Sequence, residues 1–253
     1  MSIRFTGFED EMFESFSRFH KDPSDITWIK GRMGLFGKKL LHTGLQALDS
    51  SLYRECHVGV FHPDDDETLW VAFGPAELDD LLNCAHQTVS LFGSGLEVYV
   101  RVGSVAAIDL LRRNVRSGEK TFIQIVTAMP EPFEVQVRER TRRAPKRFVV
   151  GPPVLRLAPA DVRDPTSSGF SELVRLLAEI RYPHFSMRRR LDRNQVIELG
   201  GTCLVEEVLN IMTAFQPLVT FLNEDPVEIQ RLEAEIRALQ AQIDALGGGT
   251  GTP

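Results

Sequence analysis

Strict alternation of apolar and polar side chains in two short segments constrains the fold of this chain more than any other feature. The segments are LEVYVRV, residues 96–102, and FEVQVR, residues 133–138. Successive strand side chains point to opposite faces, so each segment predicts a β-strand with one buried face and one solvated face. The apolar faces consist of Leu96, Val98, Val100 and Val102 in the first segment and Phe133, Val135 and Val137 in the second.

Other segments of the first 165 residues predict more strands and several helices. Residues 56–61 and 68–73 flank an acidic turn and predict a hairpin. Residues 121–132 are interpreted as a strand that pairs with 133–140, and RFVVGPPVLRLAP, residues 147–159, predicts a further strand pair. Helical spacing is present in residues 8–20, 75–85 and 104–118, whereas the glycines that precede Lys38 favour a loop there.

The character of the chain changes after Pro159, where three helical patterns follow one another in residues 167–180, 202–222 and 225–246. The fold class expected is therefore α+β, with a twisted mixed or antiparallel sheet, flanking helices and a C-terminal helical segment. We expect a β-rich α+β domain over residues 1–165, a helical tail over 166–246 and a flexible end over 247–253.

The last helical pattern has well-defined ends and a coiled-coil seam. Asp225 and Pro226 suit a helix start, and Gly247 suits its end. Apolar residues recur at intervals of three and four, namely Ile229, Leu232, Ile236, Leu239, Ile243 and Leu246. This spacing favours a parallel dimer, although Glu228 would then face Glu233 of the second copy. Docking of the seam on the chain's own helices is the alternative.

The bulk composition excludes several classes of protein. The 253 residues carry a net charge of -6, which disfavours a nucleic-acid coat protein. The three cysteines are scattered, which favours a reducing compartment, and no leader or apolar span is present, so a cytoplasmic protein is expected. We found no phosphate-binding or dinucleotide loop and no nucleophile motif, and we interpret HVGVFHPDDDE, residues 57–67, as a solvated turn. The sequence therefore predicts no catalytic residue, metal or cofactor.

Two basic clusters stand out in this acidic chain. The first consists of Arg138, Arg140, Arg142, Arg143, Lys146 and Arg147, and the second of Arg188, Arg189, Arg190 and Arg193. Such runs are most often solvated surface, but they are also candidates for binding anionic lipid headgroups or nucleic-acid phosphates. Few aromatic residues lie within the first cluster, and base stacking would need them. The pattern therefore favours lipid over nucleic acid.

The order of these elements resembles the N-terminal, pore-forming half of gasdermins, over residues 8–165. The closest part is FIQIVTAMPEPFEVQVRE, residues 122–139, which is similar to a paired set of strands in that family. The resemblance implies a chain that is held inactive until a protease removes a C-terminal segment. The freed half would then bind acidic lipid, form a homo-oligomer and insert a β-barrel, as in cell death or defence.

Applied to this chain, the resemblance makes the alternating strands the candidate membrane-facing segments and the first basic cluster the candidate lipid-binding site. The helical tail would be inhibitory, and the second basic cluster would lie in the region cleaved. The protein would be cytoplasmic when inactive and would move to the inner membrane when activated. The chain lacks the early cysteine of bacterial members and the full repressor domain of vertebrate members, so it is closer to the small microbial type.

The residues also permit a second class of function. A non-enzymatic binding or assembly protein could use the C-terminal seam and the basic clusters to engage a protein or nucleic-acid partner. A hydrolase or nuclease with an unrecognised site is a third interpretation, although Tyr99 occupies the position that a nuclease motif built on Asp64 and Glu97 would give to lysine.

Overall fold

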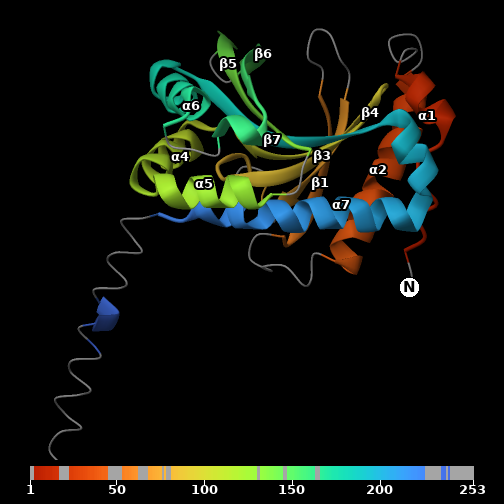
Figure 1. Ribbon diagram of the computed structural model, residues 1–253. Helices are drawn as coiled ribbons and strands as arrows, with labels where there is room; N and C mark the ends of the chain where they lie inside the picture. The colour runs from red at the N-terminus through yellow and green to blue at the C-terminus, as the bar shows by residue number, and fades with distance from the viewer. Residues whose placement is uncertain are drawn as a thin grey trace, which may run out of the picture.

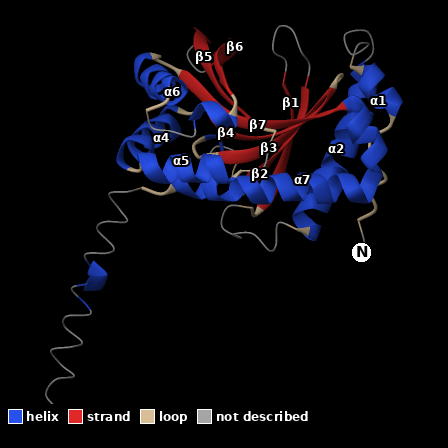
Figure 2. Ribbon diagram, in the orientation of Figure 1, coloured by secondary structure: helices blue, strands red, loops and turns tan. Residues whose placement is uncertain are grey.

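The computed structural model confirms the α+β class, with one seven-stranded antiparallel sheet and helices packed against it (Figures 1 and 2). The description that follows covers residues 3–16, 23–44, 53–61, 68–75, 77, 81–129, 132–144, 147–162, 166–225, 235–237 and 239. Within these ranges, the side chains of residues 23–26, 60, 61, 142–144, 147–149 and 159 are not described.

The strands follow the order β1-β2-β3-β4-β7-β5-β6 in the sheet. Their bounds are β1 Glu55–Phe61, β2 Thr68–Gly74, β3 His86–Phe92, β4 Gly95–Val102, β5 Glu134–Ala144, β6 Arg147–Leu157 and β7 Pro183–Asp192. Every neighbouring pair is antiparallel. Strand β7 comes last in the sequence, yet it lies between β4 and β5, so it joins an N-terminal meander to the β5–β6 hairpin.

The helices are α1 Asp10–Ser15, α2 Pro23–Thr43, α4 Val105–Ser117, α5 Glu119–Ala128, α6 Ser168–Glu179 and α7 Arg193–Asn223, with a 3-10 helix, η2, at Pro159–Val162. Figure 1 shows α7 running along the sheet, with α4, α5 and α6 near one end of it and α1 and α2 near the other. The long helix α7 thus links the two groups.

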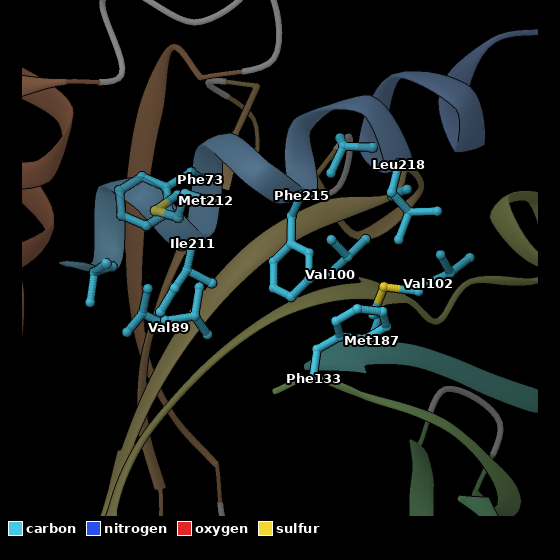
Figure 3. Packing of buried hydrophobic residues seen from close by; sticks show 14 of the residues in the cluster. Phe73, Val89, Val100, Val102, Phe133, Met187, Ile211, Met212, Phe215 and Leu218 are labelled. Carbon is cyan, nitrogen blue, oxygen red and sulfur yellow. The ribbon is translucent and has the colours of Figure 1, made fainter. Parts of the chain in front are cut away.

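The main core lies between α7 and one face of the sheet. Phe215 and Leu218 of α7 point toward Val100 and Val102 of β4, as Figure 3 shows. All four side chains are buried. A Phe215→Ala change would remove a large buried ring, which costs about 3 to 5 kcal/mol in comparable cores. The apolar faces predicted for residues 96–102 and 133–137 are thus the surfaces on which the helices pack.

The prediction of a loop before Lys38 is wrong, because these residues belong to helix α2. Gly34 and Gly37 lie one turn apart on the side of the helix that faces β1 and β2. A Cβ atom placed on Gly37 would lie 2.5 Å from Cγ2 of Val71, and one on Gly34 would lie 3.8 Å from Cγ2 of Val58. The glycines therefore allow close contact between helix and sheet, and they do not break the helix here.

Helix α7 starts from a complete capping box and contains one kink. The Asp192 carboxylate accepts a hydrogen bond from the Gln195 backbone N–H at 2.9 Å, and the Gln195 side chain accepts one from the Asp192 N–H at 2.9 Å. Gly200 has a φ of 64°, outside the helical range. Because this left-handed conformation suits glycine, the first turns of α7 can change direction at Gly200.

The prediction of a strand over residues 121–132 is wrong, because this segment forms α5. Phe122, Ile123 and Val126 are buried together on one helical face. The same residues also fit a two-residue repeat in so short a run, so periodicity alone does not decide between helix and strand. The hairpin partner of β5 is instead β6, a single strand where a strand pair was expected.

The prediction of a purely helical tail is also wrong. Residues 183–192 form β7, which pairs with β4 on one side and with β5 on the other. Phe185, Met187 and Leu191 join the same buried cluster as the core of the first 165 residues. A boundary at residue 165 would therefore divide one sheet and one core. Helices α6 and α7 agree with the patterns read in 167–180 and 202–222, whereas 225–246 lies almost entirely outside the described residues.

Candidate functional site: a polar sheet face rich in arginine

The sheet face that points away from α7 is polar and crosses six strands, β2 to β6 together with β7. The strand register aligns Trp70, Ser90, Glu97 and Arg190 in one row, and Thr88, Tyr99, Arg188 and Glu134 in the next. A third row contains His86, Arg101, Ser186, Gln136 and Arg156, and His184 pairs with Arg138 in a fourth. We call this surface the polar face. It gathers arginines from β4, β5, β6 and β7.

A hydrogen-bonded chain of side chains crosses the middle of the polar face. Arg188 donates to Glu97 at 2.8 Å and to Glu134 at 3.1 Å, so it joins β7 to both of its neighbours. Gln136 donates to Glu134 at 2.7 Å and accepts from Arg138 at 3.1 Å. Burial raises the pKa of Glu134, but the hydrogen bonds from Gln136 and Arg188 outweigh it and lower that pKa overall. The Glu134 carboxylate therefore stays ionised, and the hydrogen bonds from Arg188 hold the middle of the face in a fixed arrangement.

At one end of the polar face, three arginines surround a buried histidine. We call Arg101, Arg138, Arg140 and His184 the basic cluster. Burial lowers the pKa of His184 well below its usual value, and the charges of Arg101, Arg140 and Arg138 lower it further. A Cβ atom on Gly103 would lie 3.5 Å from both Arg101 Nε and His184 Cδ2, so these two side chains pack over the same glycine. His184 is therefore neutral beside concentrated positive charge.

The pKa values of two arginines in the basic cluster are also lowered. Burial lowers the pKa of Arg138, and the charge of Arg188 lowers it further. Burial also lowers the pKa of Arg140, and the charge of Arg101 lowers it further. Like charges held together in a partly buried place favour the binding of an anion, because an anion relieves their repulsion.

Buried polar atoms without partners point to the same surface. Nδ1 of His184 and Oγ1 of Thr88 are buried and have no hydrogen-bond partner among the described residues, and the same holds for Nε1 of Trp70. His184 is 7% exposed. Most buried polar groups in proteins are hydrogen-bonded, so three such atoms on one sheet face call for an explanation. These atoms have no contact with solvent, so a bound ligand would reach them only if the side chains above them moved aside.

An open groove with a volume of about 600 Å³ lies at the other end of the polar face. It is lined by Pro132, Phe133, Glu134, Arg156, Leu157, Ala158, Arg188 and Arg190. We call it the arginine groove. Its volume falls in the range of known small-ligand sites, and it combines guanidinium groups with an apolar wall. The guanidinium of Arg190 lies 4.8 Å from the centre of the Phe92 ring. The groove could thus hold both a negative charge and a flat ring.

The structure brings together parts of the two basic clusters that the sequence kept apart. Pairing of β5 with β7 places Arg138 opposite His184 and Glu134 opposite Arg188, so both clusters contribute to the polar face. Of the first cluster, Arg138 and Arg140 are half-buried, whereas the side chains of Arg142, Arg143, Lys146 and Arg147 lie outside the description.

The second basic cluster is not an exposed segment of a helical tail. Arg188 and Arg190 are on the polar face, whereas Arg189 donates to Glu207 of α7 at 2.8 Å. Arg193 forms an ion pair with Asp10 of α1 at 2.6 Å. Cleavage between Arg188 and Arg193 would cut β7 in the middle of the sheet, so the structure argues against this segment as an accessible cleavage site.

The residues predicted to face a membrane are all in the core. Leu96, Val98, Val100, Val102, Val135 and Val137 are fully buried, and Phe133 is 6% exposed. Contact of these strands with lipid would first require the displacement of α7. Two seam residues, Ile236 and Leu239, are 63% and 58% exposed, so at these positions the seam does not dock on the chain's own helices. Ile229, Leu232, Ile243 and Leu246 lie outside the described residues.

Sequence reasoning missed Arg101, Arg156 and His184, since each lies outside the runs of closely spaced basic residues. For His184, the signal that could have found it is the alternation in PHFSMRRRLD, residues 183–192, where Phe185, Met187 and Leu191 mark a strand. In the described part of the chain, no group of three or more His, Cys, Asp or Glu side chains could hold a metal ion. There too, no helix combines the length and apolar character needed to cross a membrane.

The sequence matches no protein-family model and none of the curated proteins. The resemblance to gasdermins therefore stays a prediction. The polar face is the feature of the structure that indicates a function.

Proposed function

We propose that this protein is a non-enzymatic binding protein that holds an anionic ligand on the polar face of its sheet. The observation that carries the proposal is the basic cluster: Arg138 lies opposite His184 in the strand register, and Arg101 and His184 pack over the same glycine. The buried Nδ1 of His184 has no hydrogen-bond partner among the described residues. Guanidinium groups bind phosphate and carboxylate oxygens through fixed pairs of N–H donors. The ligand class is thus an oxyanion, or a larger molecule that carries one.

The overall charge of the protein strengthens this interpretation. A net charge of -6 repels anions in general, so strong binding needs a local concentration of positive charge. Six arginines on the polar face, Arg101, Arg138, Arg140, Arg156, Arg188 and Arg190, share that face with Glu97 and Glu134. The face is therefore cationic although the protein is acidic.

Calorimetric titration with inorganic pyrophosphate tests the proposal. The double variant Arg101→Gln/Arg138→Gln should bind at least about tenfold more weakly than the unchanged protein, because two charge-assisted contacts are lost. The matched control is Arg116→Gln, which removes an exposed arginine from α4. Equal loss in both variants, or no binding by the unchanged protein, would contradict the proposal.

Pore formation after proteolysis is a second candidate, and one observation favours it. The apolar faces of β3, β4 and β7 all pack against the same helix, α7, so displacement of one element would uncover much of the sheet. The position of Arg188, Arg189 and Arg190 in β7, between two paired strands, counts against the predicted cleavage region. Release of a dye from anionic liposomes distinguishes this candidate from the binding protein.

A further inference from the structure

The polar face has two positively charged ends, and their separation indicates what kind of ligand it takes. The basic cluster includes His184, and the arginine groove includes Arg190, which is on the same strand six positions later. At about 3.3 Å per residue this separation is about 20 Å. An isolated phosphate can reach only one end, whereas an extended polyanion can reach both.

The middle of the polar face carries no excess of positive charge. Glu97 and Glu134 both accept hydrogen bonds from Arg188, and their side chains are 16% and 31% exposed. A phosphate directly above these carboxylates would be repelled. The middle therefore suits an uncharged part of a ligand, with negative charges held at the two ends.

Aromatic side chains lie on the same face as the arginines, although they are far from them in the sequence. Trp70 of β2 and Tyr99 of β4 belong to the first two rows, and Phe92 of β3 lies beneath Arg190. Sheet faces that combine basic and aromatic side chains bind single-stranded nucleic acids by phosphate contacts and base stacking. The sequence pattern disfavoured this ligand because few aromatic residues lie within the first basic cluster, and because the net charge is -6.

A flat membrane fits this surface less well than an extended chain does. The polar side chains at its centre, Thr88, Ser90, Gln136 and Ser186, are each at most 5% exposed. The atoms that lack partners, on Thr88 and His184, are equally buried. A bilayer presents headgroups over its whole surface and would need exposed positive charge at the centre as well, whereas an extended chain needs it only at the two ends.

We infer that the polar face binds a single-stranded nucleic acid, with phosphates at the basic cluster and beside Arg190 of the arginine groove, and with bases between them. This inference rests on the proposed anion-binding function. A length of about 20 Å corresponds to the lower end of the site sizes of single-strand-binding domains, about four nucleotides.

Fluorescence anisotropy with labelled oligothymidylates of about 2 to about 12 nucleotides tests the inference. Affinity should rise with length until the oligomer spans both ends, and then level off. The double variant Arg156→Gln/Arg190→Gln should bind the long oligomers at least about tenfold more weakly, and its salt dependence should be shallower by a slope of about 1.4. Its binding of dinucleotide and pyrophosphate should weaken much less, because these short anions reach only one end of the polar face.

Two controls separate the possible failures. Arg156→Lys/Arg190→Lys keeps the charges, so it should retain most of the binding to long oligomers, and melting temperatures of all variants should match. Pyrophosphate binding with no dependence on oligomer length would leave the proposed function standing and overturn this inference. Equal binding of polyglutamate, or of vesicles that contain anionic lipid, would overturn it as well. If none of these probes binds, both proposals are overturned.

Discussion

Arg188 of β7 donates a hydrogen bond to Glu97 of β4 at 2.8 Å, with both side chains about 85% buried. The same guanidinium reaches Glu134 of β5 at 3.1 Å. One side chain therefore ties together three strands from distant parts of the sequence. If it were removed, Glu97 would lose this ion pair, and Glu134 would keep a longer one to Arg156 at 3.7 Å.

Replacement of Arg188 by Met should lower the free energy of unfolding by about 2 to 3 kcal/mol, because two partly buried carboxylates would lose their pairing with Arg188. Urea unfolding measures the change. Arg175→Met on α6 is the matched control, since Arg175 also pairs with two glutamates, Glu172 and Glu179, but at an exposed position. Equal stability of the Arg188 variant and this control would contradict the prediction.

Two glycines of α2 should respond in opposite directions to alanine. Gly37→Ala should destabilise the protein by about 1 to 3 kcal/mol, because the added Cβ would lie 2.5 Å from the buried Val71 side chain. Gly31→Ala should stabilise it by about 0.5 to 1 kcal/mol, because nothing lies within 4 Å of the new atom and alanine favours helix. Thermal melts of both variants test the pair. If both variants change the stability in the same direction, contact with the sheet does not explain the glycine at position 37.

The stability of the fold should fall in mild acid. Burial lowers the pKa of His86 from 6.5 to about 4, and the charge of Arg101 adds to this effect. Between these values the unfolded chain binds a proton that the folded chain does not. Unfolding therefore becomes easier as the pH falls from 6.5 toward 4, by up to about 3 kcal/mol for this group.

Burial and the neighbouring arginines also lower the pKa of His184, so it should act in the same direction. Urea unfolding at neutral pH and near pH 5 measures the combined effect. A His86→Gln variant should show a smaller loss between the two conditions. A stability that does not change with pH would mean that water reaches these histidines in the folded protein.

Removal of residues 226–253 should leave the folded body and its binding of pyrophosphate intact. In the described part of the chain, the contacts that hold the end of α7 involve residues no later than Asp225: Asn114 donates to the carbonyl oxygens of Phe221 at 2.6 Å and Glu224 at 2.8 Å. Neither the truncated chain nor the full one should release dye from anionic liposomes. Release by the truncated chain alone would support the pore-forming candidate over the binding protein.

Strict alternation proved sufficient to predict β4 and the first half of β5 from the sequence. Residues 105–117 were also correctly predicted as a helix, and Ser104 caps it by accepting a hydrogen bond from Ala107 N–H at 3.0 Å. These elements were predictable because their local pattern agrees with their environment in the fold. Helix α2 was missed because its glycines are explained by contact with the sheet, which no local pattern reveals.

The candidate site was only half predictable, for a related reason. Arg138, Arg140, Arg188 and Arg190 were recognised as basic runs, but their common surface exists only through the pairing of β5 with β7. The three successive arginines at residues 188–190 concealed the alternation of β7. Arg101 and His184 became recognisable only when the register placed them on the same face as the others.

The central position of β7 also governs when this protein can fold during its synthesis. Residues 55–102 can pair as a local meander as soon as they emerge from the ribosome, and the β5–β6 hairpin can form soon afterwards. In the described sheet, residues 183–192 join the two parts, so the sheet must wait for most of the chain to be made. Contacts between such distant segments slow folding and leave strand edges open to wrong partners in the meantime.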